Sequence, residues 1–131
     1  MFKAILNHDG HVAPTELLPC SAITPKFGMA LLQSSGKLAI ATGTNKPTYI
    51  SMVEKSAAVT AGDLIPVVKV QPEMVFETTN SASLADVSVG AKVTLHASSG
   101  MQVTATTTSG VATIVEKLGD DIGSRIRVRF E

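Results

Sequence analysis

Short apolar runs, each followed by a small polar turn, repeat along most of this sequence. Residues 29–32 and 37–41 flank Ser34-Ser35-Gly36, a pattern typical of a tight β-hairpin. Strand-like runs then recur about every 8–12 residues, which favours a sandwich or barrel. Further strands are expected at residues 48–53, 64–70, 74–78, 92–96, 101–107, 111–117 and 125–131. The pattern predicts an all-β fold, a small β-barrel or sandwich of short antiparallel strands.

The first 27 residues differ from the rest because Pro14, Pro19 and Pro25 interrupt them. Proline removes a backbone donor and fixes φ, so regular strand pairing is not expected here. Residues 2–6 suit a short strand and residues 15–18 a single helical turn. We interpret residues 1–27 as an extended, irregular N-terminal arm that packs along its own barrel or reaches a neighbour, and residues 28–131 as the β-domain. Deleting residues 1–12 is then expected to leave a folded barrel.

Pro66 lies inside the apolar run of residues 64–70. A central strand cannot lose that backbone donor, so this strand is expected at a sheet edge or with a bulge. Exposed edges pair readily with other chains. The Pro66 edge is therefore a candidate subunit interface.

The composition predicts a core with few aromatic residues and a surface that is partly buried against another subunit or partner. Hydrophobic residues make up 44% of the chain and aromatic residues 4%, with no Trp. The core must therefore consist of Val, Ile, Leu, Ala and Met, and Met29, Met52, Met74 and Met101 are expected to fill it. Charged residues are only 17%, and the mean hydropathy is +0.27. Such an apolar chain is expected to bury surface against another subunit or partner.

Charge and segment length bear on partners and on location. The formal net charge is zero, so no overall field attracts nucleic acid or an acidic membrane. No segment approaches the roughly 20 apolar residues of a membrane-spanning helix, and the first apolar run is too short for a signal peptide. We therefore expect no nucleic-acid or membrane partner and production in a cytoplasm.

Metal-ligand residue types gather at His8, Asp9 and His11. A closed zinc site needs four ligands on a rigid frame, and no further ligand stands at a suitable spacing. The Asp120-Asp121 pair resembles part of a calcium loop but lacks the alternating oxygen ligands such loops need. A turn is the expected structure in both places, and no metal or cofactor is predicted.

Nucleophilic catalysis would need a set such as Cys20, His96 and Asp86. No family signature surrounds Cys20, the single cysteine, and a small packed thiol is the expected role. The sequence therefore predicts no enzyme.

Three arginines stand at alternate positions near the end of the sequence: Arg125, Arg127 and Arg129. On a strand this spacing places them on one face, with the intervening apolar residues on the other. Such a stripe can form cross-strand ion pairs, for instance with Glu116 or Glu73, or bind carboxylates of a neighbouring protein. Phosphate binding is a third interpretation, but no aromatic residues accompany the stripe for stacking single strands.

Several of these features together resemble the small β-rich decoration, or cement, proteins that coat the heads of tailed bacteriophages. The matching segments are Gly28-Met29-Ala30-Leu31, Ser35-Gly36-Lys37-Leu38, Gly43-Thr44 before Lys46-Pro47, Ala61-Gly62-Asp63 before Ile65-Pro66-Val67, and, less closely, residues 125–130.

The resemblance implies a structural virion protein on the capsid exterior. Its partner would be the major capsid protein, and it would be a homo-oligomer, which in the decoration class is often a trimer. It would stabilise the shell by bridging capsid subunits. Residues expected at capsid or intersubunit contacts are Phe2, Lys3, His8, His11, Pro66, Arg125, Arg127 and Arg129.

Two other classes remain open. The first is another small virion module, from a tail, baseplate or spike. The second is an oligonucleotide-binding barrel, which should show a basic groove with several exposed aromatic residues, whereas this chain has one Tyr and no Trp.

Overall fold

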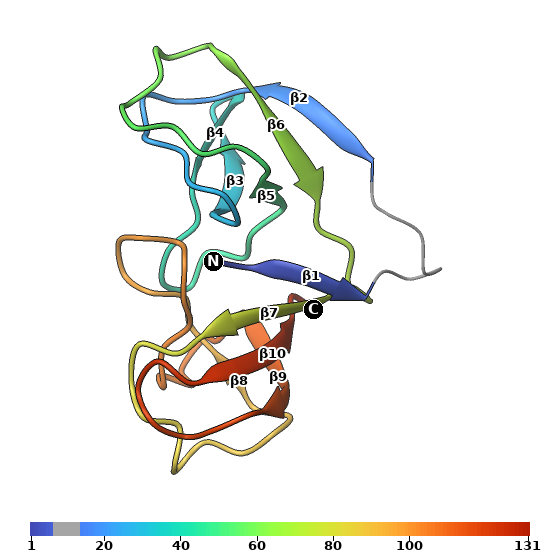
Figure 1. Ribbon diagram of the computed structural model, residues 1–131, viewed down its shortest axis with the longest axis vertical. Coiled ribbons are helices and arrows are strands. Elements are labelled where there is room, and N and C mark those ends of the chain that lie inside the picture. The colour runs from blue at the N-terminus through green and yellow to red at the C-terminus, as the bar shows by residue number, and fades with distance from the viewer. Residues whose placement is uncertain (7–13) are drawn as a thin grey trace.

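The computed structural model describes residues 1–6 and 14–131, and these form ten strands and no helix. The strands make two antiparallel five-stranded sheets that pack together, as Figure 1 shows. The first sheet has the order β1 (Lys3–Leu6), β7 (Val75–Thr79), β10 (Arg125–Arg129), β9 (Ala112–Lys117) and β8 (Lys92–Val93). The second has the order β2 (Thr15–Pro19), β6 (Leu64–Lys69), β5 (Tyr49–Ser51), β3 (Ala30–Ser34) and β4 (Lys37–Ile40). The all-β prediction is confirmed, and the sheets are not closed into a barrel, which is consistent with a sandwich.

The hairpin of β3 and β4 shows why turn chemistry predicted its position well. Ser34 pairs with Lys37, and the two residues between them both have positive φ, 52° at Ser35 and 77° at Gly36. That combination is a type I′ turn, whose twist matches the twist of the flanking strands. The expected hairpin is confirmed.

The N-terminal segment contributes two strands to the domain, and its residues 20–27 are irregular. β1 pairs with β7 in the first sheet, and β2 pairs with β6 in the second. The expected helical turn at residues 15–18 is therefore wrong, and regular pairing does occur in this segment. The prolines permit it because Pro14 precedes β2 and Pro19 is its last residue, so neither interrupts the strand.

Pro66 does not lie on an edge strand, because β6 runs between β2 and β5. The Pro66 carbonyl accepts a hydrogen bond from Met52 N at 2.9 Å, so its backbone groups point toward the β5 side. β5 ends at Ser51, so the missing N–H faces a position just past that strand. The opposite side of Pro66 faces Leu17 of β2 in a pair that needs no proline donor. A central strand thus tolerates proline here.

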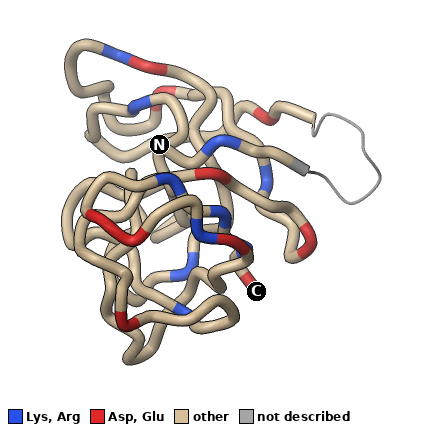
Figure 2. The backbone as a smooth tube through the Cα atoms, turned by 60° about the horizontal axis from the view of Figure 1, so that its bottom comes forward, with Lys and Arg blue, Asp and Glu red and all other residues tan. Residues whose placement is uncertain are grey.

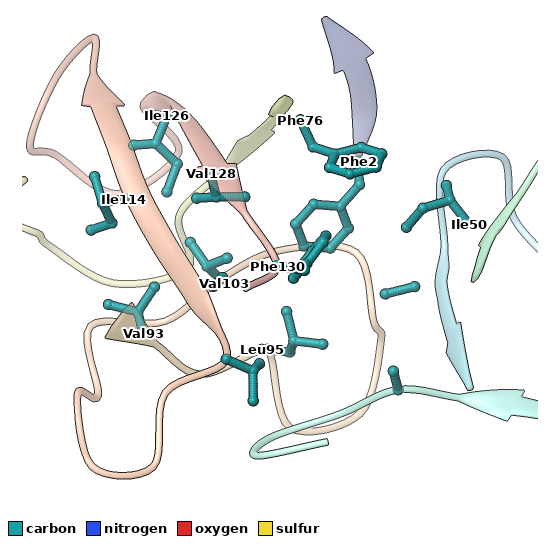
Figure 3. Close-up of a cluster of buried hydrophobic side chains, with 14 of the residues drawn as sticks. Phe2, Ile50, Phe76, Val93, Leu95, Val103, Ile114, Ile126, Val128 and Phe130 are labelled. Atoms are coloured by element: carbon teal, nitrogen blue, oxygen red, sulfur yellow. The ribbon is translucent and has the colours of Figure 1, made fainter. Parts of the chain in front are cut away.

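The larger core cluster receives side chains from both sheets (Figure 3). Its aromatic centre is Phe130, whose ring centroid lies 5.2 Å from that of Phe2 and 5.4 Å from that of Phe76. All three rings are almost fully buried. Phe2 was expected at a contact with another protein, but its side chain is part of the core.

A smaller cluster lies on the other side of the second sheet, which curls around it. Its buried members are Cys20, Met29, Leu31, Leu38, Ile65 and Val67. The edges of this sheet approach each other at one point, where Cys20 and Leu38 form a parallel bridge and Ser21 N donates to Leu38 O at 2.9 Å.

The methionines divide between core and surface. Met29 and Met74 are buried as expected, and Met101 is partly buried against the smaller cluster. Met52 is 38% exposed, contrary to the core role expected for it. No helix long and apolar enough to cross a membrane is found in the described residues.

Candidate protein-interaction surface

The residues considered for nucleophilic catalysis have separate structural roles. Cys20 is fully buried, and its Sγ lies 3.7 Å from the Leu38 carbonyl oxygen. Burial raises the pKa of this thiol, which disfavours the thiolate that a nucleophile needs. The His96 ring belongs to a local turn, where its Nδ1 accepts from Ser99 N at 3.3 Å. These contacts fit the packed thiol that the sequence indicates.

The described residues likewise do not bring metal-ligating side chains together into a metal site. His8, Asp9 and His11 lie outside the described residues. Within residues 1–6 and 14–131, no group of three or more His, Cys, Asp or Glu side chains could hold a metal ion. Asp120 instead pairs with Lys117, whose Nζ lies 2.7 Å from Asp120 Oδ1.

The arginine stripe lies on the outer face of the first sheet. Arg127 Nη1 donates to Glu116 Oε2 at 2.8 Å, and Arg127 Nε lies 3.6 Å from Glu77 Oε2. Arg125 Nη1 is 3.7 Å from Glu77 Oε1. The cross-strand ion pair with Glu116 is confirmed. Glu77 could not be identified as an ion-pair partner from the sequence, because only the register of β7 and β10 places it opposite Arg127.

Charge is balanced over the sequence as a whole, whereas the stripe has three arginines against two glutamates. Figure 2 shows basic and acidic residues interspersed along the backbone. Lys3, another expected contact residue, is exposed on β1 and stands opposite Glu77 in the register. Arg129 is partly buried at the end of β10, opposite Thr113. The first sheet therefore presents a charged face on which Arg125 and Arg127 pair with glutamates, while the buried Nε of Arg129 has no hydrogen-bond partner among the described residues.

An uncharged apolar surface lies instead on the second sheet, around Pro66. Leu17 of β2 stands directly opposite Pro66 of β6, and the backbone N–H of Met52, just past the end of β5, donates to the Pro66 carbonyl on the other side, so the three residues form a row. Pro19 and Leu64 form the next cross-strand pair on the same side. We call Leu17, Pro19, Met52, Leu64 and Pro66 the outer apolar face.

Exposure is high across this face. Leu17 is 63% exposed, Leu64 60% and Met52 38%, while both prolines are half-buried. Large apolar side chains at these exposures leave a neighbouring set of nonpolar groups in water, and such a surface commonly marks a protein contact.

The alternation of side chains along β6 explains how this face arises. Ile65 and Val67 point into the smaller cluster, whereas Leu64 and Pro66 point outward. Val68 lies on the outward side too, but the first sheet covers it as part of the larger core. On the outward side of β6, side chains are therefore buried where the first sheet covers them and exposed to solvent where it does not. Sequence reasoning singled out Pro66 alone and missed Leu17, Met52 and Leu64.

No model of a known protein family matches this sequence, and no curated protein matches it significantly.

Proposed function

We propose that this protein is a structural component of a tailed-bacteriophage virion, which binds the outside of an assembled capsid and stabilises it. The observation that carries the proposal is the outer apolar face, with Leu17 and Leu64 each about 60% exposed on a regular pair of strands. The resemblance of the turn and strand segments to decoration proteins supplies the kind of partner.

The character of the face suits a protein partner. Its five residues are all apolar. Four of them are held in register by the backbone hydrogen bonds of β2 and β6, and Met52, just past β5, is fixed by its hydrogen bond to Pro66. The fully buried centres of protein interfaces are depleted of charge and enriched in apolar groups. A rigid sheet also loses little conformational freedom on binding, which leaves more of the burial free energy for affinity.

The mechanism of stabilisation would be additive. Each copy would contact neighbouring capsid subunits, so that expansion or rupture of the shell would break many contacts together. A homo-oligomer, a trimer in particular, would multiply modest affinities in the same way. The major capsid protein is the proposed partner, and the exterior of the virion is the proposed location.

Co-sedimentation with mature heads of the parent phage that lack this protein tests the proposal. We expect saturable binding of the wild-type protein at a fixed number of copies per shell subunit. The double variant Leu17→Ser/Leu64→Ser should bind at least about tenfold more weakly, because it removes the two most exposed side chains of the face.

Two controls make the result specific. Val89→Ser removes an apolar side chain that is 56% exposed but lies outside the face, and it should bind normally. Sedimentation velocity of each variant without heads separates shell contact from contact between copies. Absence of wild-type binding, with the protein folded, would refute decoration and favour another virion module.

A further inference from the structure

A second apolar feature lies on the loop that joins β9 to β10. Ile122 is 72% exposed, more than any other large apolar side chain in the described residues, and Leu118 in the same loop is 45% exposed. We call residues 118–124 the anchor loop. A single exposed apolar residue needs no explanation, so the way this loop is held decides its meaning.

Hydrogen bonds to backbone atoms of the anchor loop fix it on both sides of Ile122. Leu84 N donates to Asp120 O at 2.8 Å, and Asn80 Nδ2 donates to Asp121 O at 3.0 Å. After Ile122, Gly123 N donates to Asn80 O at 2.9 Å. The residues around Ile122 are therefore tied to the segment that follows β7.

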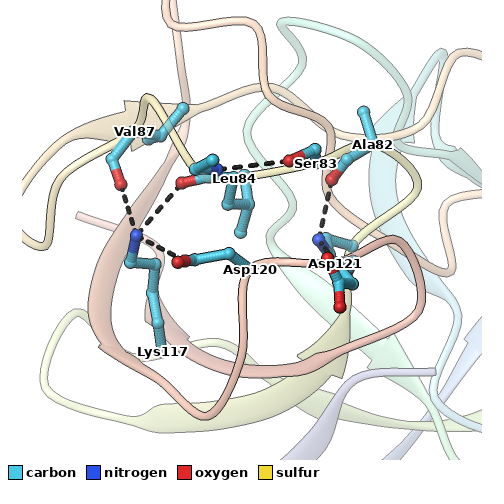
Figure 4. A network of polar contacts seen from close by, with 9 residues as sticks. Ala82, Ser83, Leu84, Val87, Lys117, Asp120 and Asp121 are labelled. Carbon is cyan, nitrogen blue, oxygen red and sulfur yellow. Dashed lines mark hydrogen bonds and ion pairs between the residues drawn. The ribbon is translucent and has the colours of Figure 1, made fainter.

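A buried amide and a lysine complete this brace (Figure 4). Asn80 is fully buried, so its hydrogen bonds to the loop are shielded from water. Lys117 Nζ lies 2.7 Å from Asp120 Oδ1 and donates to the carbonyl oxygens of Leu84 at 3.0 Å and Val87 at 2.8 Å. Polar side chains therefore hold the loop in place, while the apolar side chains of Leu118 and Ile122 are exposed to solvent.

An apolar side chain on a fixed loop is suited to insertion into a partner. Binding normally costs free energy to order loops and side chains, and a loop that is already ordered avoids that cost. Residues that dominate binding typically fill desolvated pockets near the centre of an interface. Ile122 has the chemistry and the exposure for this role, and Leu118 adds apolar area beside it.

The charges next to Ile122 indicate the character of the pocket. Asp120 and Asp121 immediately precede it and are both exposed. The basic groups that flank the loop are Lys117, which pairs with Asp120, and Arg125, which lies 3.7 Å from Glu77. Because Lys117 matches the charge of Asp120, the exposed Asp121 carboxylate is the acidic group beside the apolar tip, and it complements an apolar pocket with a basic group at its rim.

We propose that Ile122 and Leu118 form a second binding point, which inserts into an apolar, basic-rimmed pocket of the capsid shell. This inference rests on the proposed function. The anchor loop lies near one end of the molecule's long axis, and β2 with the start of β6 lies at the other (Figure 1). One copy can then contact two places on the shell, which is the geometry that bridging requires.

Ile122→Ser tests the binding point in the same head-binding assay. We expect at least about tenfold weaker binding, with thermal unfolding unchanged because the side chain is largely in water. Ile122→Leu should restore binding, since it keeps the apolar volume. Val89→Ser is the matched control, with a similarly exposed apolar side chain outside the loop.

Asp121→Asn tests the basic rim, because it removes one charge and leaves the Asp121 carbonyl that accepts from Asn80. We expect its binding to depend less on salt than that of the wild type. If Ile122→Ser binds heads as tightly as the wild type does, the anchor loop is not a binding point, and the proposal of capsid decoration is unaffected. Failure of the wild type itself to bind would overturn both. Loss of self-association without loss of head binding would also overturn the inference, because the occupant would then be a second copy.

Discussion

Replacing Phe2 by Ala should remove a large part of the free energy of unfolding of this domain. The sequence had indicated the opposite, namely that a chain without residues 1–12 would still fold. The Phe2 ring is 1% exposed and stands edge-on to Phe130, with the ring centroids 5.2 Å apart. Its backbone is fixed as well, because Phe2 N donates to Gly28 O at 2.8 Å. The ring therefore closes one side of the larger core cluster, and no neighbour can fill its place without moving a strand.

The cost follows from the volume removed. Truncating a buried Phe to Ala typically costs about 3–5 kcal/mol, which includes the cavity left behind. The edge-on contact with Phe130 accounts for about 0.5–1.5 kcal/mol of such a loss. Domains have total stabilities of about 5–15 kcal/mol, so a large fraction would disappear. For a chain of this length we expect the melting temperature to fall by roughly 10–20 °C.

Urea denaturation followed by far-ultraviolet circular dichroism measures this loss. The midpoint should fall without a change in the slope m, since the same surface is exposed on unfolding. Ile5→Ala is the matched control in β1, the strand that follows Phe2: Ile5 is 42% exposed, and its truncation should cost about 1 kcal/mol or less. Equal, small losses for both variants would show that Phe2 does not belong to the core, and the arm interpretation would be right.

Three further predictions concern close packing, titration and charge. Gly110→Ala should cost about 3 kcal/mol or more in a thermal melt, because a Cβ there would lie 2.3 Å from the carbonyl carbon and oxygen of Lys92; a loss below about 1 kcal/mol would contradict that packing. Burial raises the pKa of the Cys20 thiol, so above about pH 8.5 the unfolded chain releases a proton that the folded chain keeps, and the free energy of unfolding should fall with rising pH. Urea titrations at several pH values measure this slope, and Cys20→Ala should remove it. An unchanged slope in Cys20→Ala would refute the assignment. Arg127→Glu should cost about 1–2 kcal/mol by urea titration, since it replaces ion pairs to two glutamates by repulsion, whereas Arg125→Glu, at a 68% exposed side chain, should cost less; the reverse order would argue against the paired geometry.

Local chemistry made the β3–β4 hairpin and most strands predictable, although the strand expected at residues 101–107 is wrong because that segment forms only isolated bridges at Val103. The β3–β4 turn needs two residues of positive φ, and Ser35-Gly36 supplies them at the expected position. The arginine stripe was also readable, because alternation along β10 needs no knowledge of other strands. Each of these features depends on residues close together in the sequence.

Pairing between distant segments was not predictable in the same way. β2 and β6 are separated by more than forty residues, and nothing in the local sequence of β2 shows that a partner strand is available. Three prolines in the first 27 residues favoured an irregular arm, since the sequence does not reveal which backbone groups a strand leaves unused. Pro66 was misplaced for the same reason: its missing donor is harmless only because β5 stops at Ser51.

The outer apolar face follows from the same non-local pairing, and this is an argument for its role. Leu17, Met52 and Leu64 are each ordinary strand residues in sequence, and only the register of β2, β6 and β5 brings them to one surface. A shift of one residue in β6 would turn Ile65 outward and Leu64 inward, so the register chosen keeps Ile65 and Val67 in the core. That choice does not require the outward positions to be apolar, because polar residues there would satisfy the fold equally well. Apolar side chains at those positions are not required by the stability of the domain, which supports the proposed contact with another protein.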